Sequence, residues 1–313
     1  MLNLDLLAAA ITILALEILL RLTFRHASGD SPDGFRKGML DISHRLKLFS
    51  GIESHPFLQF TRPRTQLSKG DQEYGFRGIK LSDVPKPAGV ARIACIGGRG
   101  TEGGYPEFLQ AYLDAASRAS RFQVLDFGID GWTSVHSMLN FILNVREFHP
   151  DIVVIHDELR GGVCSGYPCP CRDRIHDYTP QPFRDNPLDE WMLRIWWIYR
   201  AGKVLLARSR DDAFDRDRRE LQQYQRNIET ICTLAASDGI KVFLLTMPCA
   251  TDDGSHSDPT RAVNEVLREI ANQRKIALVE LENLSDADKT DNRMKAERVG
   301  KMIVALGSGA HGQ

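Results

Sequence analysis

Two different patterns of apolar residues alternate from residue 91 onward. Short runs in which every residue is apolar, such as residues 152–155, are typical of strands buried on both faces of a parallel sheet. Longer segments with apolar residues three and four positions apart are typical of helices. The expected strands are 92–96, 122–125, 152–155, 241–246 and 277–280. The expected helices are 106–116, 134–148, 188–207, 216–236, 261–272 and 292–304.

This alternation predicts an α/β fold, in which a doubly wound parallel sheet lies between two helical layers and the crossovers are right-handed. A chain of 313 residues can bury a large core in one such domain. We assign residues 91–306 to it. Residues 26–90, rich in Arg, Pro, Gly and Ser, are expected to be a connector that wraps the domain, and residues 307–313 a flexible tail.

The N-terminal segment is apolar without the spacing of a core helix. Residues 6–16 carry no charge, and apolar residues continue to Phe24 around Glu17 and Arg21. A spanning helix needs roughly 20 apolar residues, so residues 1–25 are expected to be a membrane anchor or an interfacial helix. Glu17 and Arg21 lie four residues apart and can pair on one helix face. A helix docked on the protein is the alternative.

The side of the membrane is left open by two opposing signals. Basic residues follow the N-terminal segment from Arg21 to Lys37 and none precedes it, which places the remaining chain in the cytoplasm by the positive-inside rule. Cys164, Cys169 and Cys171 lie in one expected loop, which suits an oxidising compartment and a disulfide. Their spacing lacks the paired C-x-x-C of a zinc knuckle, so no metal site is expected.

Overall charge argues against a nucleic-acid partner. The chain has 40 basic and 41 acidic residues and a formal net charge of −1, without the basic footprint that nucleic-acid binding requires. The helix expected over 188–207 is rich in aromatic residues, among them Trp191, Trp196 and Tyr199. Such a face can stack on sugars or lie at a membrane interface, but packing against the core and the N-terminal extension is favoured.

A glycine-rich turn follows the first expected strand. Gly98–Gly103 matches G-x-G-x-x-G, and Asp126 closes the next strand, where a ribose-binding acid would lie in a dinucleotide site. However, Pro106 can only begin a helix, so the last glycine lies outside the helix whose N-terminus would bind the phosphates. Dinucleotide binding is therefore the least favoured function, and no cofactor is expected.

Taken together, several segments resemble the SGNH/GDSL hydrolase family, in its membrane-anchored, polysaccharide-associated form. Their order and spacing agree over roughly residues 72–305. The resemblance implies an SGNH-hydrolase-like, flavodoxin-like sheet and a domain outside the cytoplasm. The segments are Tyr74–Gly78, Lys86–Pro87, Arg92–Gly98, Val124–Ser134, His149–Ile155, Tyr224–Asn227, Val242–Pro248 and Asn264–Arg268.

The resemblance also locates the family's catalytic positions, and most of them are substituted. Arg99 takes the place of the serine nucleophile, and arginine cannot accept an acyl group. Gly131 matches the backbone oxyanion donor, whereas Arg160 falls near the asparagine donor. Asp286 and Lys289 align with the Asp-x-x-His pair, and a protonated lysine near two arginines is a poor general base.

These substitutions predict a catalytically degenerate domain with a binding or assembly role linked to cell-envelope or exopolysaccharide carbohydrate. Arg99, Gly131 and Arg160 would bind an acidic or acylated carbohydrate, because arginine forks fit carboxylates. Neutralisation of the cations in a salt-bridged plug is the alternative. The acids available for it are Asp126, Asp157, Glu158 and Asp286.

An atypical esterase or O-acyltransferase is the second functional hypothesis. Catalytic triads are defined by geometry and not by chain order, so other residues near the strand ends could replace the lost ones. The candidates are Thr101, Ser134, Ser137, His136, His156 and Asp157.

Overall fold

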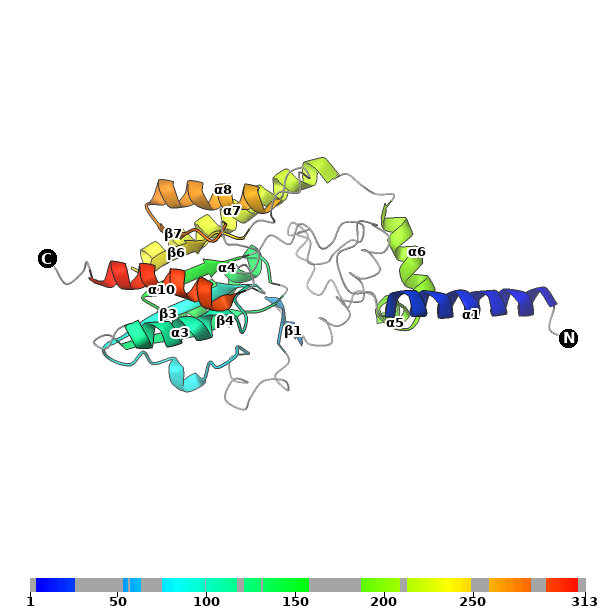
Figure 1. Cartoon of the computed structure of the whole chain (residues 1–313), viewed down its shortest axis with the longest axis horizontal. Coiled ribbons are helices and arrows are strands. Elements are labelled where there is room, and N and C mark those ends of the chain that lie inside the picture. The colour runs from blue at the N-terminus through cyan, green and yellow to red at the C-terminus, as the bar shows by residue number, and fades with distance from the viewer. Residues whose placement is uncertain are drawn as a thin grey trace. The chain divides into compact units, whose positions relative to one another are not determined.

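The computed structural model describes eleven stretches of the chain, which fall into two compact units. One unit comprises residues 1–52 and 160–216, and the other comprises residues 53–159 and 217–313 (Figure 1). We call them the helical unit and the sheet unit and describe each by itself. The described residues are 4–25, 53–55, 57–62, 75–98, 100–116, 121–130, 132–157, 187–208, 213–248, 259–282 and 291–308.

The sheet unit contains a five-stranded parallel sheet with the strand order β4-β3-β5-β6-β7. The first strand, β3, lies next to the edge strand β4, and the chain winds outward from it in both directions, so the predicted doubly wound sheet is confirmed. The strands are β3 (Val90–Gly97), β4 (Arg121–Gly128), β5 (Ile152–His156), β6 (Lys241–Leu245) and β7 (Ala277–Val279).

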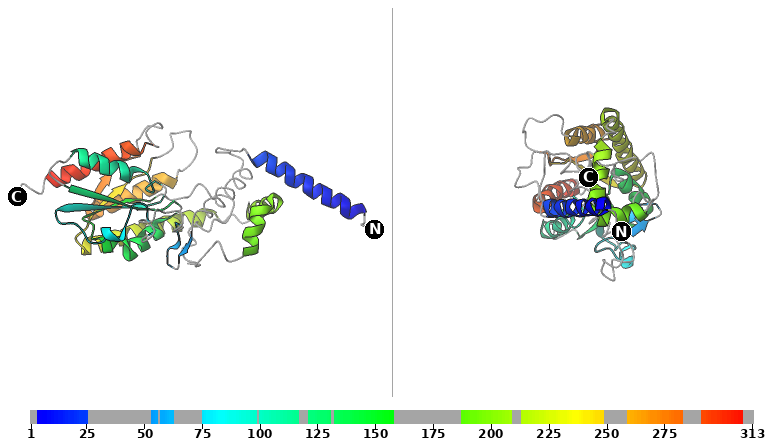
Figure 2. Two further views of the ribbon diagram at one scale, coloured as in Figure 1. Left: turned by 90° about the horizontal axis from the view of Figure 1, so that it is seen from below. Right: turned by 90° about the vertical axis from the view of Figure 1, so that its right-hand side faces the viewer.

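Helices cover both faces of this sheet, as the α/β prediction requires (Figure 2). Alternate strand residues such as Cys95 and Val154 pack with Leu109 and Val299 of α3 and α10 on one face. On the other face, Tyr224 and Asn227 of α7 bond to the end of β5 and to α4. The helices are α3 (Tyr105–Ala116), α4 (Ser134–Leu143), α7 (Ala213–Ser237), α8 (Pro259–Arg274) and α10 (Asn292–Ser308).

Two predicted helices are each divided. The helix expected over 134–148 ends at Leu143, and the 3-10 helix η4 (Val145–Phe148) follows. His149 then adopts a left-handed backbone with φ of 47° before Pro150, which stops further helix. The helix expected over 188–207 is interrupted at Trp196 and forms α5 (Pro187–Ile195) and α6 (Trp197–Arg208).

The expected connector over 26–90 contains regular structure that its composition did not predict. A short antiparallel hairpin joins β1 (Glu53–His55) and β2 (Gln59–Thr61), and the 3-10 helix η3 (Leu81–Asp83) precedes β3. Each element has three residues, too short for a hydrophobic period to be recognised.

The helical unit consists, in its described part, of α1 (Leu4–Arg25), α5, α6 and the first residues of α7, 213–216. The aromatic ring of Phe24 stacks on Trp197 at 6.2 Å between ring centroids, so the favoured packing against the N-terminal extension is present. Among the described residues, no helix combines the length and apolar character needed to cross a membrane. The predicted transmembrane helix is therefore not supported, and an interfacial helix stays a prediction.

Candidate functional site

The five family positions inferred from the sequence all lie outside the described residues. They are Arg99, Gly131, Arg160, Asp286 and Lys289, and the same holds for Glu158 and for the three cysteines Cys164, Cys169 and Cys171. The residues on both sides of positions 99 and 131 are described, however. These neighbours define the frame of the candidate site at the carboxyl ends of the strands.

Close backbone contacts hold the segments around positions 99 and 131 side by side. The carbonyl of Gly97 accepts a hydrogen bond from Ile129 N at 3.1 Å. A Cβ atom on Gly98 would lie 2.9 Å from the carbonyl oxygen of Trp132, and one on Gly97 only 2.1 Å from that of His156. Only glycine fits at such approaches. The ends of β3, β4 and β5 therefore meet through backbone, which explains the glycine pair of this turn.

A carboxylate in the turn fastens three separate segments. Glu102 accepts both Nε and Nη2 of Arg62, the former at 2.5 Å, and it also accepts the backbone N–H of Asp130 at 2.7 Å. The hydrogen bond to Glu102 raises the pKa of Arg62. The residue after β2, the turn after β3 and the loop after β4 are thereby linked, and we call these bonds of Glu102 the Glu102 latch. Sequence reasoning missed this latch, because forty residues separate its two side chains.

Asp126 is used within the protein and not for a ribose. Its carboxylate accepts the backbone N–H groups of Gly103 at 2.8 Å and Gly128 at 2.9 Å. Burial raises its pKa to about 7, against the opposing effect of these two hydrogen bonds. Helix α3 starts at Tyr105, with Pro106 in its first turn as predicted. A dinucleotide site would need the Asp126 carboxylate for the ribose and the Gly103 N–H for a phosphate. These two groups bond to each other instead, which argues against the dinucleotide hypothesis.

The hydroxyl groups proposed for a rebuilt triad are buried and bond to groups other than imidazoles. Ser137 Oγ donates to Asp157 Oδ1 at 2.7 Å, and Ser134 Oγ accepts Asn227 Nδ2 at 3.0 Å. Thr101 Oγ1 donates to the carbonyl of residue 156 at 3.4 Å. These hydroxyls are poor candidates for a nucleophile, because each is buried and none is bonded to an imidazole that could remove its proton.

The two histidines of that hypothesis are buried and held neutral. His136 Nδ1 accepts the backbone N–H of Thr133 at 3.1 Å and lies 3.0 Å from its Oγ1, in a capping box at the start of α4. Burial lowers the pKa of His136 to about 4. Burial and the nearby charge of Lys295 lower the pKa of His156 to about 3, and neither of its ring nitrogens makes a hydrogen bond of normal geometry.

Lys295 is a buried cation at this edge that sequence reasoning missed. The sequence does contain a signal for this burial, because Lys295, Val299 and Ile303 lie four residues apart and therefore share one face of α10. Val299 and Ile303 belong to the core cluster of the α3 and α10 face. A lysine on the apolar face of a helix carries its charge toward the core, and here it reaches the neighbourhood of the His156 ring.

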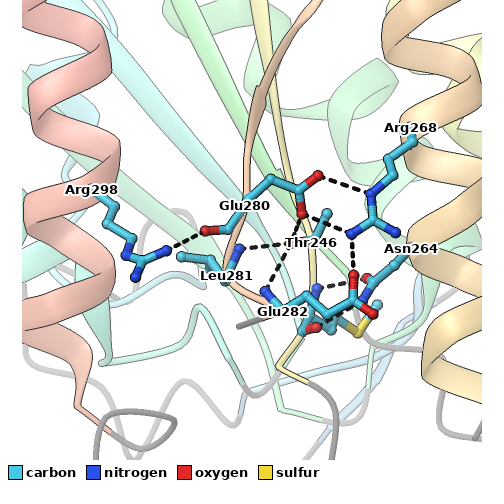
Figure 3. A network of polar contacts seen from close by, with 8 residues as sticks. Thr246, Asn264, Arg268, Glu280, Leu281, Glu282 and Arg298 are labelled. Atoms are coloured by element: carbon cyan, nitrogen blue, oxygen red, sulfur yellow. Dashed lines mark hydrogen bonds and ion pairs between the residues drawn. The ribbon is translucent and has the colours of Figure 1, made fainter. Parts of the chain in front are cut away.

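A second polar region lies after β6 and β7 (Figure 3). Arg268 of α8 makes two bonds of 2.9 Å to the carboxylate of Glu280 and a third bond to Glu282. Thr246 Oγ1 donates to Glu280 and accepts the backbone N–H of residue 281 at 2.7 Å, while Arg298 donates to the Glu280 carbonyl at 2.7 Å. Opposite charges therefore neutralise one another here and fix residues 280–282.

Known proteins resemble this chain only weakly, in structure and in sequence. No family model matches the chain, and no curated protein matches it. Among solved structures, the acetyl xylan esterase AlAXEase has a TM-score of 0.43 at 14% identity, covering 68% of this chain and 99% of the other. A GDSL-like lipase from Bacteroides thetaiotaomicron has a TM-score of 0.38 at 16% identity, covering 69% and 88%. A mutant of Axe2, an acetyl-xylooligosaccharide esterase from Geobacillus, has 0.42 at 14%, covering 69% and 93%. No argument about activity rests on these likenesses.

Proposed function

We propose that the sheet unit is an SGNH-hydrolase-like domain that binds a ligand at the carboxyl ends of its strands and does not hydrolyse it. One observation carries this proposal. The described serines and the threonine offered as replacement nucleophiles, Ser134, Ser137 and Thr101, are buried and hydrogen-bonded to groups other than imidazoles. The family resemblance adds that the serine position itself holds Arg99. A site without an activated hydroxyl has no route to an acyl-enzyme.

The ligand class we propose is an acidic or acylated carbohydrate, bound by Arg99 and the backbone of Gly131. Guanidinium groups bind carboxylates through two parallel hydrogen bonds, and a backbone N–H can donate a hydrogen bond to an acyl carbonyl oxygen. Support comes from the frame of the site, because the contact of Gly98 with Trp132 and the Glu102 latch hold the segments that flank positions 99 and 131. A fixed frame lowers the entropy cost of binding.

Titration calorimetry with uronic-acid oligosaccharides and acetylated xylooligosaccharides tests this function. We expect Arg99→Gln to weaken binding at least tenfold, the effect of losing a charge-assisted hydrogen bond of about 1.5–3 kcal/mol. Arg121→Gln is the matched control, since this exposed arginine starts β4 at the opposite edge of the sheet. Equal binding by wild type and Arg99→Gln would remove the proposed role of Arg99.

An atypical esterase is the second candidate, and the pairing of Thr133 with His136 is the observation in its favour. The 3.0 Å contact between Thr133 Oγ1 and His136 Nδ1 joins a hydroxyl to an imidazole. The same nitrogen accepts the Thr133 N–H, and burial lowers the histidine pKa to about 4, so the ring is a weak base. Ester turnover that Thr133→Val abolishes and Thr133→Ser retains would establish this candidate.

Restoration of the family residues distinguishes a lost site from one that never existed. The double variant Arg99→Ser with Lys289→His supplies the nucleophile and the base of the resemblance. Turnover of an acetyl ester by the double variant and not by either single variant is expected if the frame around position 99 has kept its original geometry. The readout is release of acetate, with Ser137→Ala as a control that removes a hydroxyl outside the restored pair.

A further inference from the structure

Residues 8–16 of α1 are exposed on every side and, apart from Thr12, apolar. Each residue from Ala8 to Leu16 is exposed, and the side chains of Ile11 and Leu14 are 61% and 60% exposed. Nine consecutive residues make two and a half helical turns, so the exposed residues lie all round this part of the helix. A groove on a partner covers one face of a helix, whereas a lipid phase surrounds the helix. The exposure pattern therefore favours a surrounding apolar medium.

Glu17 is the first residue after Ala8 that is only partly exposed, and an ion pair there ties α1 to α6. Glu17 accepts the backbone N–H groups of Trp197 and Ile198, both at 3.0 Å, and also Nε of Arg21 at 2.8 Å. These two N–H groups begin α6, where a carboxylate is favoured by the helix dipole and by unsatisfied donors. Arg21 in turn donates Nη2 to the carbonyl of Ile195 at 2.5 Å. Residues 8–16 of α1 thus precede a fixed contact between α1 and the start of α6, which we call the α1–α6 junction.

Tryptophan and arginine residues lie close in sequence to the α1–α6 junction. Trp196 is 42% exposed and follows Ile195, the residue whose carbonyl Arg21 binds, and Trp191 of α5 is 52% exposed. Three of the four tryptophans of the chain lie in α5, α6 and the residue between them. Exposed Trp beside Arg at the end of an apolar helix is the arrangement of a membrane interface, where indole rings lie among headgroups and arginine meets phosphate.

We propose that the helical unit binds the surface of a lipid bilayer that contains anionic headgroups, with residues 8–16 of α1 inserted in one leaflet. These nine residues are about 13 Å long, and a helix at the boundary between headgroups and acyl chains keeps Asp5, three residues earlier, among the headgroups. Arg21, Trp191 and Trp196 then lie at headgroup level. The proposal is independent of the carbohydrate function, because its residues belong to the helical unit and the ligand residues Arg99 and Gly131 to the sheet unit.

Co-sedimentation of the full chain with vesicles tests the proposal. The probes are vesicles of phosphatidylcholine alone and of phosphatidylcholine with phosphatidylglycerol. We expect the chain to pellet with both, more strongly with the anionic vesicles at low salt. Leu14→Asp should reduce binding at least tenfold, because a charged side chain is costly inside a leaflet. The matched control is Phe57→Asp in the sheet unit, where the ring is 59% exposed, and it should bind as wild type does.

Three results would overturn the proposal. The wild-type chain could stay in the supernatant with both vesicles. Leu14→Asp could pellet as wild type does, which would exclude insertion of this turn. Finally, sedimentation velocity could show a dimer that Leu14→Asp dissociates while neither protein binds vesicles, which would make a second copy the occupant of the apolar surface. Circular dichroism of Leu14→Asp keeps the test valid, since an exposed site should leave the helix content unchanged.

Discussion

The two ends of the sheet's carboxyl edge are built in different ways. After β3, β4 and β5 the backbone itself is in contact, through glycines that admit no side chain, and the candidate hydroxyl and imidazole groups are buried. After β6 and β7 the contacts are made by partly exposed arginine and glutamate side chains (Figure 3). The first region cannot adjust without loss of packing, whereas the second can exchange ion pairs with water. We infer that the first region fixes the ligand site and the second supports the segment that leads toward Asp286.

The largest expected effect comes from a methyl group in the rigid region. Gly97→Ala places a Cβ atom 2.1 Å from the His156 carbonyl oxygen and 2.6 Å from Thr101 Oγ1, and no side-chain rotation relieves the contact with the His156 backbone. We expect a loss of more than about 3 kcal/mol in unfolding free energy, at the upper end of overpacking effects. Gly202→Ala in α6 is the control, since nothing lies within 4 Å of its added Cβ. Urea denaturation measures both, and similar stability of the two variants would contradict the contact.

The pH dependence of stability distinguishes the two regions next. The folded-state pKa of Asp126 is raised from 3.8 to about 7, so the folded protein holds a proton that the unfolded chain has lost. Stability from this group is therefore present below pH 3.8 and is lost as pH rises toward 7, by at most about 1.4 kcal/mol per pH unit. Asp126→Asn should flatten that decline. Exposed Asp114→Asn should not, and a decline unchanged in Asp126→Asn would contradict the assignment.

Titration of Glu280, in the second region, changes stability with pH in the opposite direction. The hydrogen bond from Arg268 lowers its pKa, so its stabilising effect is present above the ordinary value of 4.5 and is lost as pH falls through the lowered value. Glu280→Gln should therefore change the acid limb of the stability profile and leave the range between pH 5 and 7 unchanged. A change confined to the neutral range would place the titration on another group.

Removal of one buried hydroxyl has an intermediate effect. Ser137→Ala leaves Asp157 Oδ1 without its donor at 2.7 Å in a fully buried position, at a cost of about 1–3 kcal/mol. Ser237→Ala, at the exposed end of α7, should change stability by less than about 0.5 kcal/mol. Equal, small losses in thermal denaturation of the two variants would show that the Ser137 bond has no stabilising role.

The smallest effect is expected in the exposed ion-pair region. Arg268→Gln removes three bonds to Glu280 and Glu282, but its side chain is 35% exposed and water can replace the lost partners. We expect a loss of about 1 kcal/mol or less, as for other surface ion pairs, and a further decrease of the difference at high salt. A loss as large as that of Gly97→Ala would contradict the contrast between the two regions.

Local pattern was sufficient to predict the sheet and insufficient for contacts between distant segments. The apolar runs of β3 and β5 and the start of α3 near Pro106 could be predicted, because each depends on neighbouring residues. The break at Trp196 could not, since it depends on the Glu17 carboxylate 180 residues away from Trp197. Arg200 adds to it by binding carbonyls at the end of α5.

The candidate site divides in the same way. Family order predicted that the segments around positions 99 and 131 belong to one site, and their described neighbours are in contact. The pairing of Ser137 with Asp157 could not be predicted, because it depends on how α4 lies over the end of β5. For the same reason, sequence alone left the rebuilt triad open, and the hydrogen bonds of the described residues argue against it.

Intact-mass spectrometry after treatment with a serine-reactive fluorophosphonate tests the central claim most directly. The reagent labels an activated hydroxyl and leaves ordinary serines and threonines unmodified. A domain that binds without hydrolysing, with Arg99 at the nucleophile position and Ser134 and Ser137 hydrogen-bonded in the interior, should show no added mass under conditions that label a control esterase fully. A single stoichiometric adduct on any hydroxyl of the sheet unit would contradict the account.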